Sequence, residues 1–317
     1  MKVPSRKRDG KMKVMMIKSV EWCTLGLILL CYAMWAVAGW LWTTPYWLPG
    51  LLVLPVTAAF HTSLQHETIH GHPTCWNWLN ELLVSLPLAV VFPYRCYSQL
   101  HLKHHNDLNL TDPYEDPESY FWPLRDYTTM RPVMRRLFLI NNTLVGRLTL
   151  GPLLTVYGFS RTELVRIGRG ETGVLRAWTY HAAGLLILAS IIVAMFQMPL
   201  WVYCLFVVYP ALSLTALRSY AEHQAAENVG ARSAIVETHP ALALLYLNNN
   251  LHIVHHANPN VAWYELPSLY SERRNQFLAA NDNTLFKGYG EIMRRFAFRV
   301  KQPVDHPFLY RNDVVSE

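Results

Sequence analysis

The sequence predicts an all-α membrane protein with four transmembrane helices in two hairpins, interfacial helices and a cytoplasmic cap. Three observations favour this fold class. Charged residues make up only 16% of the 317 residues, against about 25% in an ordinary soluble domain. Four apolar stretches approach the roughly 20 residues that a bilayer-spanning helix needs. All 28 Lys and Arg residues lie outside the two turns that would join these stretches in pairs.

The four apolar stretches define the expected helices. They lie at about residues 24–42, 46–63, 177–198 and 200–217. The turn Thr43-Thr44-Pro45 joins the first two, and Pro199 separates the last two. Pro49 and Pro55 weaken the second helix without excluding it, because prolines are tolerated in membrane helices. Two tight hairpins follow.

The basic residues orient these hairpins. Seven precede the first stretch, eleven lie between Arg95 and Arg176, and ten lie from Arg218 onward. Since Lys and Arg gather on the cytoplasmic side of a membrane, both termini and the long central segment are expected in the cytoplasm. This explains the net charge of +6 without nucleic-acid binding, for which the chain has no motif. The expected location is the inner (plasma) membrane of a bacterial cell.

A cleavable signal peptide is an alternative for the N-terminal region. A basic start, an apolar stretch and Ala36-Val37-Ala38 fit that pattern. However, the apolar run continues to Trp42, and cleavage would leave an odd number of spans. A retained first span is therefore the preferred interpretation, and sequencing of the mature N-terminus would test it.

The remaining segments complete the expected organisation. The predicted divisions are a basic cytoplasmic N-terminal segment at 1–19, a membrane domain at 20–271 and a cytoplasmic C-terminal tail at 272–317. Residues 82–92 are too short to span and are expected at the interface or dipping into the membrane. Residues 137–157 are expected to form an interfacial helix or a shallow re-entrant segment. The five cysteines form no C-x-x-C pair and are read as reduced packing residues.

Eight of the 14 histidines fall into three clusters. "HETIH" carries His66 and His70, "HLKHH" carries His101, His104 and His105, and "HIVHH" carries His252, His255 and His256. On a helix, residues three or four positions apart share a face, so each cluster can aim its imidazoles in broadly one direction. Neutral imidazole is a good ligand for iron, zinc or copper. In the expected topology all three clusters reach the cytoplasmic face, where one metal site can collect them.

These three histidine boxes resemble those of the integral-membrane fatty acid desaturase and hydroxylase family. The resemblance covers roughly residues 45–270 and implies a non-haem di-iron centre at the cytoplasmic ends of two membrane hairpins. It also implies a ninth ligand after the last span, which is His223 in "RSYAEH". Where some relatives have a water-bridging asparagine, this chain has Ser219, whose role is open. The implied metal ligands are His66, His70, His101, His104, His105, His223, His252, His255 and His256, and no other catalytic residue is expected.

Nearby acidic residues are expected to support these ligands. A ligating histidine usually gives its other N–H to a carboxylate or a carbonyl, which fixes the tautomer. The candidates are Glu67, Asp107, Asp112, Asp116, Glu222 and Glu237. The loop "LTDPYEDPES", residues 110–119, is equally typical of a solvated turn. His61 and His72 are weaker candidates for a supporting role, and His181, His239 and His306 are expected to be structural.

The resemblance implies a membrane-bound, O2-dependent di-iron oxidoreductase that acts as a fatty acyl desaturase. A hydroxylase or ketolase acting on an alkane, carotenoid or other apolar substrate is the alternative. The implied cofactors are two iron ions, with O2 as co-substrate. The chain has neither a C-x-x-C pair nor a G-x-G-x-x-G fingerprint, so the electrons are expected from a separate ferredoxin- or rubredoxin-like carrier. Such carriers are often acidic, and the basic cytoplasmic face would attract one.

Two other classes of protein fit less well. A metal transporter should place polar ligands within its spans, whereas these clusters lie at the ends of spans. A cytochrome with bis-histidine haems needs ligands on opposite faces of each haem, and the H-x-x-H-H spacing crowds them together. Metal content would separate all of these classes.

Overall fold

The computed structural model describes residues 20–106 and 109–309. The basic segment at 1–19 and the candidate Asp107 lie outside the described residues. Within the described part, four helices are long and apolar enough to cross a membrane. They confirm the predicted fold class of two helical hairpins.

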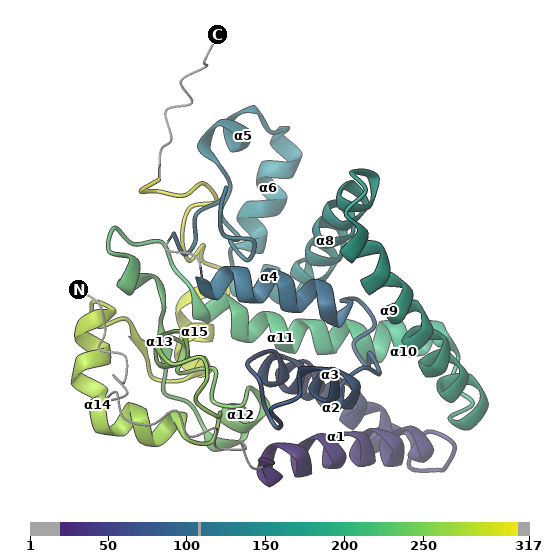
Figure 1. Cartoon of the computed structure of the whole chain (residues 1–317). Coiled ribbons are helices and arrows are strands. Elements are labelled where there is room, and N and C mark those ends of the chain that lie inside the picture. Colours follow the sequence, from purple (N-terminus) through teal and green to yellow (C-terminus); the bar gives the residue numbers. More distant parts are fainter. Residues whose placement is uncertain (1–19, 107–108, 310–317) are drawn as a thin grey trace.

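The first hairpin consists of α1 (Trp22–Leu41) and α2 (Trp47–Ile69). The second begins with α9 (Thr172–Ser190) and the π-helix η1 (Ile191–Met195). It returns through α10 (Leu200–Tyr203), the π-helix η2 (Cys204–Val208) and α11 (Tyr209–Glu222). Both returning helices extend beyond the apolar stretches at 46–63 and 200–217, and these extensions carry the chain to the histidines (Figure 1).

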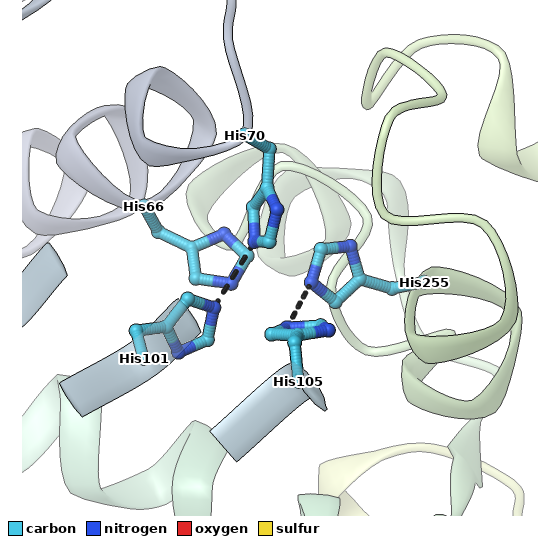
Figure 2. A group of neighbouring side chains, drawn as sticks. All are labelled: His66, His70, His101, His105 and His255. Atoms are coloured by element: carbon cyan, nitrogen blue, oxygen red, sulfur yellow. Dashed lines mark hydrogen bonds between the residues drawn. The ribbon is translucent and has the colours of Figure 1, made fainter. Parts of the chain in front are cut away.

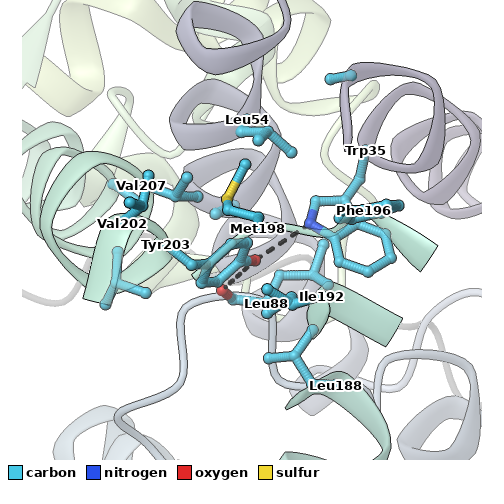
Figure 3. Packing of buried hydrophobic residues seen from close by; sticks show 14 of the residues in the cluster. Trp35, Leu54, Leu88, Leu188, Ile192, Phe196, Met198, Val202, Tyr203 and Val207 are labelled. Carbon is cyan, nitrogen blue, oxygen red and sulfur yellow. Dashed lines mark hydrogen bonds between the residues drawn. The ribbon is translucent and has the colours of Figure 1, made fainter. Parts of the chain in front are cut away.

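The two hairpins share one apolar core, shown in Figure 3. A polar contact lies inside it: Trp35 Nε1 donates to the Tyr203 hydroxyl at 3.1 Å, and that hydroxyl donates to the Leu88 carbonyl at 2.9 Å. Leu88 belongs to the irregular residues 84–93, which follow α3 (Asn77–Leu83). His181 Nε2 donates to another carbonyl of this segment, that of Val90, at 2.7 Å. Non-helical backbone at membrane depth needs such partners, so these side chains allow the segment to pack between the spans.

Gly39 permits the closest approach between the two hairpins. A Cβ atom at this position would lie 2.2 Å from a ring carbon of Phe196, whereas one at Gly26 on the same helix would meet nothing within 4 Å. Gly39→Ala is therefore expected to destabilise the protein by about 1–3 kcal/mol through overpacking. Gly26→Ala should leave stability nearly unchanged. Thermal unfolding in detergent measures both, and an unchanged Tm for Gly39→Ala would contradict the observed packing.

The central segment, between the two hairpins, is built from a series of helices. They are α4 (Tyr94–Asn106), α5 (Leu124–Thr129), α6 (Pro132–Asn141), α7 (Leu144–Thr149) and α8 (Gly151–Gly168). The prediction of one helix at 137–157 is wrong, because three helices share this stretch. Thr143 lies just after α6 and caps α7, because its side-chain hydroxyl accepts from Gly146 N at 3.0 Å. Asn142 donates its side-chain amide to the Gln302 carbonyl at 3.1 Å.

The chain after α11 folds against the ends of the spans. Its elements are the 3₁₀ helix η3 (Val229–Arg232), β1 (Ile235–Val236), α12 (Pro240–Leu245), α13 (His252–Ala257), α14 (Leu266–Ala280), β2 (Leu285–Phe286) and α15 (Tyr289–Phe296). The two strands pair in parallel, Ile235 with Leu285 and Val236 with Phe286. An apolar cluster joins this region to α7 and α11. The predicted division at 271–272 stays a prediction.

Candidate metal centre

Helix ends bring the histidines together. His66 lies in the last turn of α2 and His70 directly follows that helix. His223 follows α11 in the same way. The second box lies along α4 and the third along α13, so four separate elements contribute side chains to one place.

The nine predicted histidines form two groups. The five-histidine group contains His66, His70, His101, His105 and His255, and the four-histidine group contains His104, His223, His252 and His256. Within each group the candidate ligand atoms all lie within 4.8 Å of one another. The structure thus brings together every histidine of the predicted ligand set, while their binding of metal stays a prediction.

The spacing within each box explains the division into groups. His101 and His105, four residues apart on α4, join the five-histidine group, while His104 between them joins the other. In the third box the assignment is reversed: His252 and His256 join the four-histidine group, and His255 the five-histidine group. Successive residues on a helix point about 100° apart, whereas residues four apart nearly align. The expectation that each cluster aims in one direction is therefore corrected for the second and third boxes.

In the five-histidine group the Nε2 atoms face one another, as Figure 2 shows. His70 Nε2 lies 3.1 Å from His101 Nε2, and His105 Nε2 lies 3.1 Å from His255 Nε2. Within the described residues, the buried Nε2 atom of His66 has no hydrogen-bond partner. A buried polar atom normally has one. Its unmet bonding capacity, next to four other ring nitrogens, is typical of a metal ligand.

Within the four-histidine group, His223 faces His104 and His252. Its Nε2 atom lies 3.0 Å from His104 Nε2 and 2.8 Å from His252 Nε2. His256 Nε2 lies 3.0 Å from His252 Nε2. The four rings therefore turn the same type of nitrogen toward a common centre.

Acceptors on the outer side orient several of these rings. His104 Nδ1 donates to Asp116 at 2.7 Å, and His101 Nδ1 donates to Glu118 at 2.9 Å. Backbone and amide acceptors serve two further rings: His223 Nδ1 donates to the Arg232 carbonyl at 3.2 Å, and His252 Nδ1 donates to Asn249 Oδ1 at 3.2 Å. Such hydrogen bonds place the proton on Nδ1 and leave Nε2 free to ligate.

Of the acidic residues predicted to support the ligands, Asp116 and Glu222 lie next to histidines of the predicted set. Asp116 contacts a ligand candidate directly, and Glu222 lies 3.5 Å from His252 Nδ1 while pairing with Arg218 at 2.9 Å. The others bond elsewhere: Glu67 accepts from Trp263 N, Asp112 from Tyr114 N, and Glu237 from Tyr270 and Arg274. Sequence reasoning missed Glu118 and Asn249. The only sequence signal for Glu118 was its place in the acidic loop 110–119, and Asn249 lies three residues before the third box.

Burial keeps most of the candidate ligands neutral. Burial, reinforced by neighbouring imidazoles, holds the pKa of His105, His252, His255 and His256 well below the ordinary value. The pKa of His70 and that of His223 fall to about 3 for the same reasons. His104 differs: burial opposes its protonation, but the hydrogen bond to Asp116 raises its pKa above 6.5. Neutral imidazole is the form that binds a metal.

The weaker candidates lie outside both groups. The Tyr32 hydroxyl is hydrogen-bonded to His61 Nε2 at 3.0 Å, and His72 Nδ1 donates to Glu21 at 2.7 Å. Ser219 donates to the Ala216 carbonyl of its own helix at 3.3 Å. These contacts give His61 and His72 structural partners and leave the role of Ser219 open.

The donor set fits two transition-metal ions. Converging neutral imidazoles suit iron, copper or zinc, whereas calcium and magnesium prefer oxygen ligands. The buried Nε2 atom of His66, which has no hydrogen-bond partner among the described residues, also favours ligation over structural hydrogen bonding.

The comparison with known families agrees with this geometry. The fatty acid desaturase family matches residues 42–287, which include all nine histidines and three of the four apolar helices, all but α1. No individual curated protein matches the chain. The two histidine groups fit the two-metal site typical of that family, and the four apolar helices fit an integral membrane protein. The chain therefore belongs to the fatty acid desaturase family.

Proposed function

We propose that this desaturase-family oxidoreductase inserts a double bond into the acyl chain of a lipid, using two iron ions, O2 and electrons from a separate carrier. The observation that carries the proposal is the pair of buried histidine groups at the ends of α2 and α11. Desaturation removes two hydrogens from the chain, and these leave with O2, two electrons and two protons as two waters.

The protein's own residues would hold and shield the iron. Each histidine group would bind one ion through Nε2 atoms, and Asp116 and Glu118 would keep two of the rings in the right tautomer. Bound iron supplies the O2 chemistry that no side chain provides. His66, His104 and His255 are almost fully buried, so they keep bulk water away from the reacting centre.

The position of the groups supports an apolar substrate. His66 is part of α2 itself, within one turn of the apolar core of the span. A methylene chain entering from the bilayer would reach this place without crossing water. We further propose that the histidines face the cytoplasm of a bacterial cell, where a ferredoxin- or rubredoxin-like carrier meets a basic surface.

Lipid analysis tests the proposed reaction. The protein would be expressed in a host that lacks it, and total lipids would be compared by mass spectrometry with a His255→Ala culture. New acyl chains lighter by two hydrogens support desaturation. Products heavier by one oxygen would replace it with hydroxylation, and a carotenoid or alkane product would identify a different substrate. Purified protein that holds zinc, or no metal after iron supplementation, would overturn the oxygenase assignment and favour metal transport.

A further inference from the structure

Residues 297–306, which follow α15, pack against the end of α11, and we call them the C-terminal clamp. They are drawn in yellow in Figure 1. The clamp lies beyond residues 42–287, the part of the chain that matches the desaturase family. Its contacts are therefore a property of this chain outside the family match. They converge on the turn that carries His223.

Lys301 caps the last turn of α11. Its Nζ atom donates to the Tyr220 carbonyl at 2.6 Å and to the His223 carbonyl at 2.7 Å. The last carbonyls of a helix have no partner within the helix and carry the negative end of its dipole. The Lys301 Nζ group satisfies the hydrogen bonding of both carbonyls, while burial and the nearby Arg147 guanidinium lower the pKa of Lys301 to about 7. The Tyr120 hydroxyl donates to the same His223 carbonyl at 3.0 Å.

Gln302 holds the residues on the other side of His223. Its Oε1 atom accepts from Ala225 N at 2.9 Å, and its Nε2 atom donates to the Ala225 carbonyl at 3.2 Å. His223 itself leaves the helix in an extended conformation, with φ −121° and ψ 154°. Two consecutive side chains of the clamp thus fix the backbone directly before and after the point where the helix ends.

The clamp is also hydrogen-bonded to the central segment between the two hairpins. Lys301 N donates to the Asn142 carbonyl at 3.0 Å, and Asn142 returns a bond to the Gln302 carbonyl at 3.1 Å. Further along, Trp122 N donates to the Val304 carbonyl at 2.8 Å. Because the clamp is hydrogen-bonded both to the segment between the hairpins and to the end of α11, it links the positions of these two parts of the structure.

Accurate placement matters at His223, because its Nε2 atom lies within 3.0 Å of both His104 Nε2 and His252 Nε2. The ring has one outer hydrogen bond, to the Arg232 carbonyl, so its position depends on the backbone that carries it. We propose that Lys301 is a positioning residue for His223, so that metal binding by the four-histidine group depends on the C-terminal clamp. This inference rests on the proposed metal-binding role of the histidines.

The test compares five proteins purified in detergent: wild type, Lys301→Met, Lys301→Arg, Arg299→Met and His223→Ala. Methionine removes the hydrogen-bond donor and keeps a long unbranched chain. Arg299 is an exposed cation two residues away and serves as the matched control. Iron per chain and the Mössbauer spectrum of 57Fe-loaded protein are measured, with His223→Ala as the reference for a disrupted four-histidine group.

We expect Lys301→Met to lose iron from one of two positions, with affinity there weakened about 10–100-fold, the range for residues that support a metal ligand. Its spectrum should resemble that of His223→Ala. Lys301→Arg should recover much of the second iron, and Arg299→Met should match wild type. Two irons and an unchanged spectrum in Lys301→Met would overturn the inference.

A second measurement separates positioning from general stabilisation. At a given iron concentration, tighter binding stabilises the folded protein more, in proportion to the logarithm of the affinity, so Lys301→Met should show a smaller iron-dependent rise in Tm than wild type. If iron raised Tm equally in both proteins, and Lys301→Met had a lower Tm than wild type both with and without iron, Lys301 would have a structural role only. That result would overturn the inference. If Lys301→Met does not fold, Gln302→Met is tested against the same two expectations. Wild type without two irons would instead contradict the proposed function.

Discussion

His255→Ala is expected to remove iron from the five-histidine group and to abolish lipid oxidation. The ring of His255 is buried and its Nε2 atom lies 3.1 Å from that of His105. Alanine leaves both a missing ligand and a space that water can enter. The loss of activity should exceed about 100-fold, because even residues that only support a ligand change metal affinity or activity by about 10–100-fold. Iron per chain and lipid desaturation measure the two effects.

His239→Ala is the matched control for this variant. His239 caps α12, accepting from Ala241 N at 3.3 Å, and belongs to neither histidine group. It should retain the iron and activity of wild type. A folded His255→Ala protein that keeps two irons and full activity would remove this residue from the ligand set.

Asp116→Ala is expected to give the second-largest effect. Its carboxylate is almost fully buried, accepts from His104 Nδ1 at 2.7 Å and also accepts from the backbone N–H of Thr111 and of Glu118 at 2.7 and 2.9 Å. Removing it frees the His104 ring and leaves buried donors without an acceptor, each at a cost of about 1–3 kcal/mol. Iron affinity should fall about 10–100-fold, and Tm should fall as well.

Asp116→Asn separates these two effects. The amide keeps an acceptor oxygen for the backbone donors but removes the negative charge next to His104, so stability should recover more than iron affinity. Asp126→Ala, at an exposed position of α5, controls for the loss of a surface carboxylate. Titration of iron into metal-free protein gives the affinities. If Asp116→Ala bound iron as wild type does, Asp116 would have no role in orienting His104.

The sequence was sufficient for features that depend on neighbouring residues. The length of an apolar stretch decides whether a helix can cross a bilayer, and the four stretches became the four spans. The i, i+4 spacing decides which residues of a box share a face. It placed His66 with His70, and the order of spans and boxes placed all three boxes at one end of the hairpins.

Other parts of the site depend on residues distant in sequence. Residues 84–93 pack between the spans because Tyr203 and His181, more than 90 positions later, satisfy their carbonyls. The predicted single helix at 137–157 is interrupted where Asn142 bonds to Gln302. Glu118 contacts His101 because the acidic loop folds back on α4. No local periodicity reports such contacts, since each is decided by which segments meet in the folded chain.

By itself, the sequence determined the class of membrane protein, the four spans and the eight box histidines, because apolar length and helical spacing are local properties. The ninth, His223, came from the family resemblance. Only the tertiary structure decided how five and four histidines separate into two groups, which acceptors orient them, and that Lys301 reaches the end of α11. These features depend on the directions in which packed helices present their side chains. Those directions are set by contacts between elements that are distant in sequence, and local sequence patterns do not show such contacts.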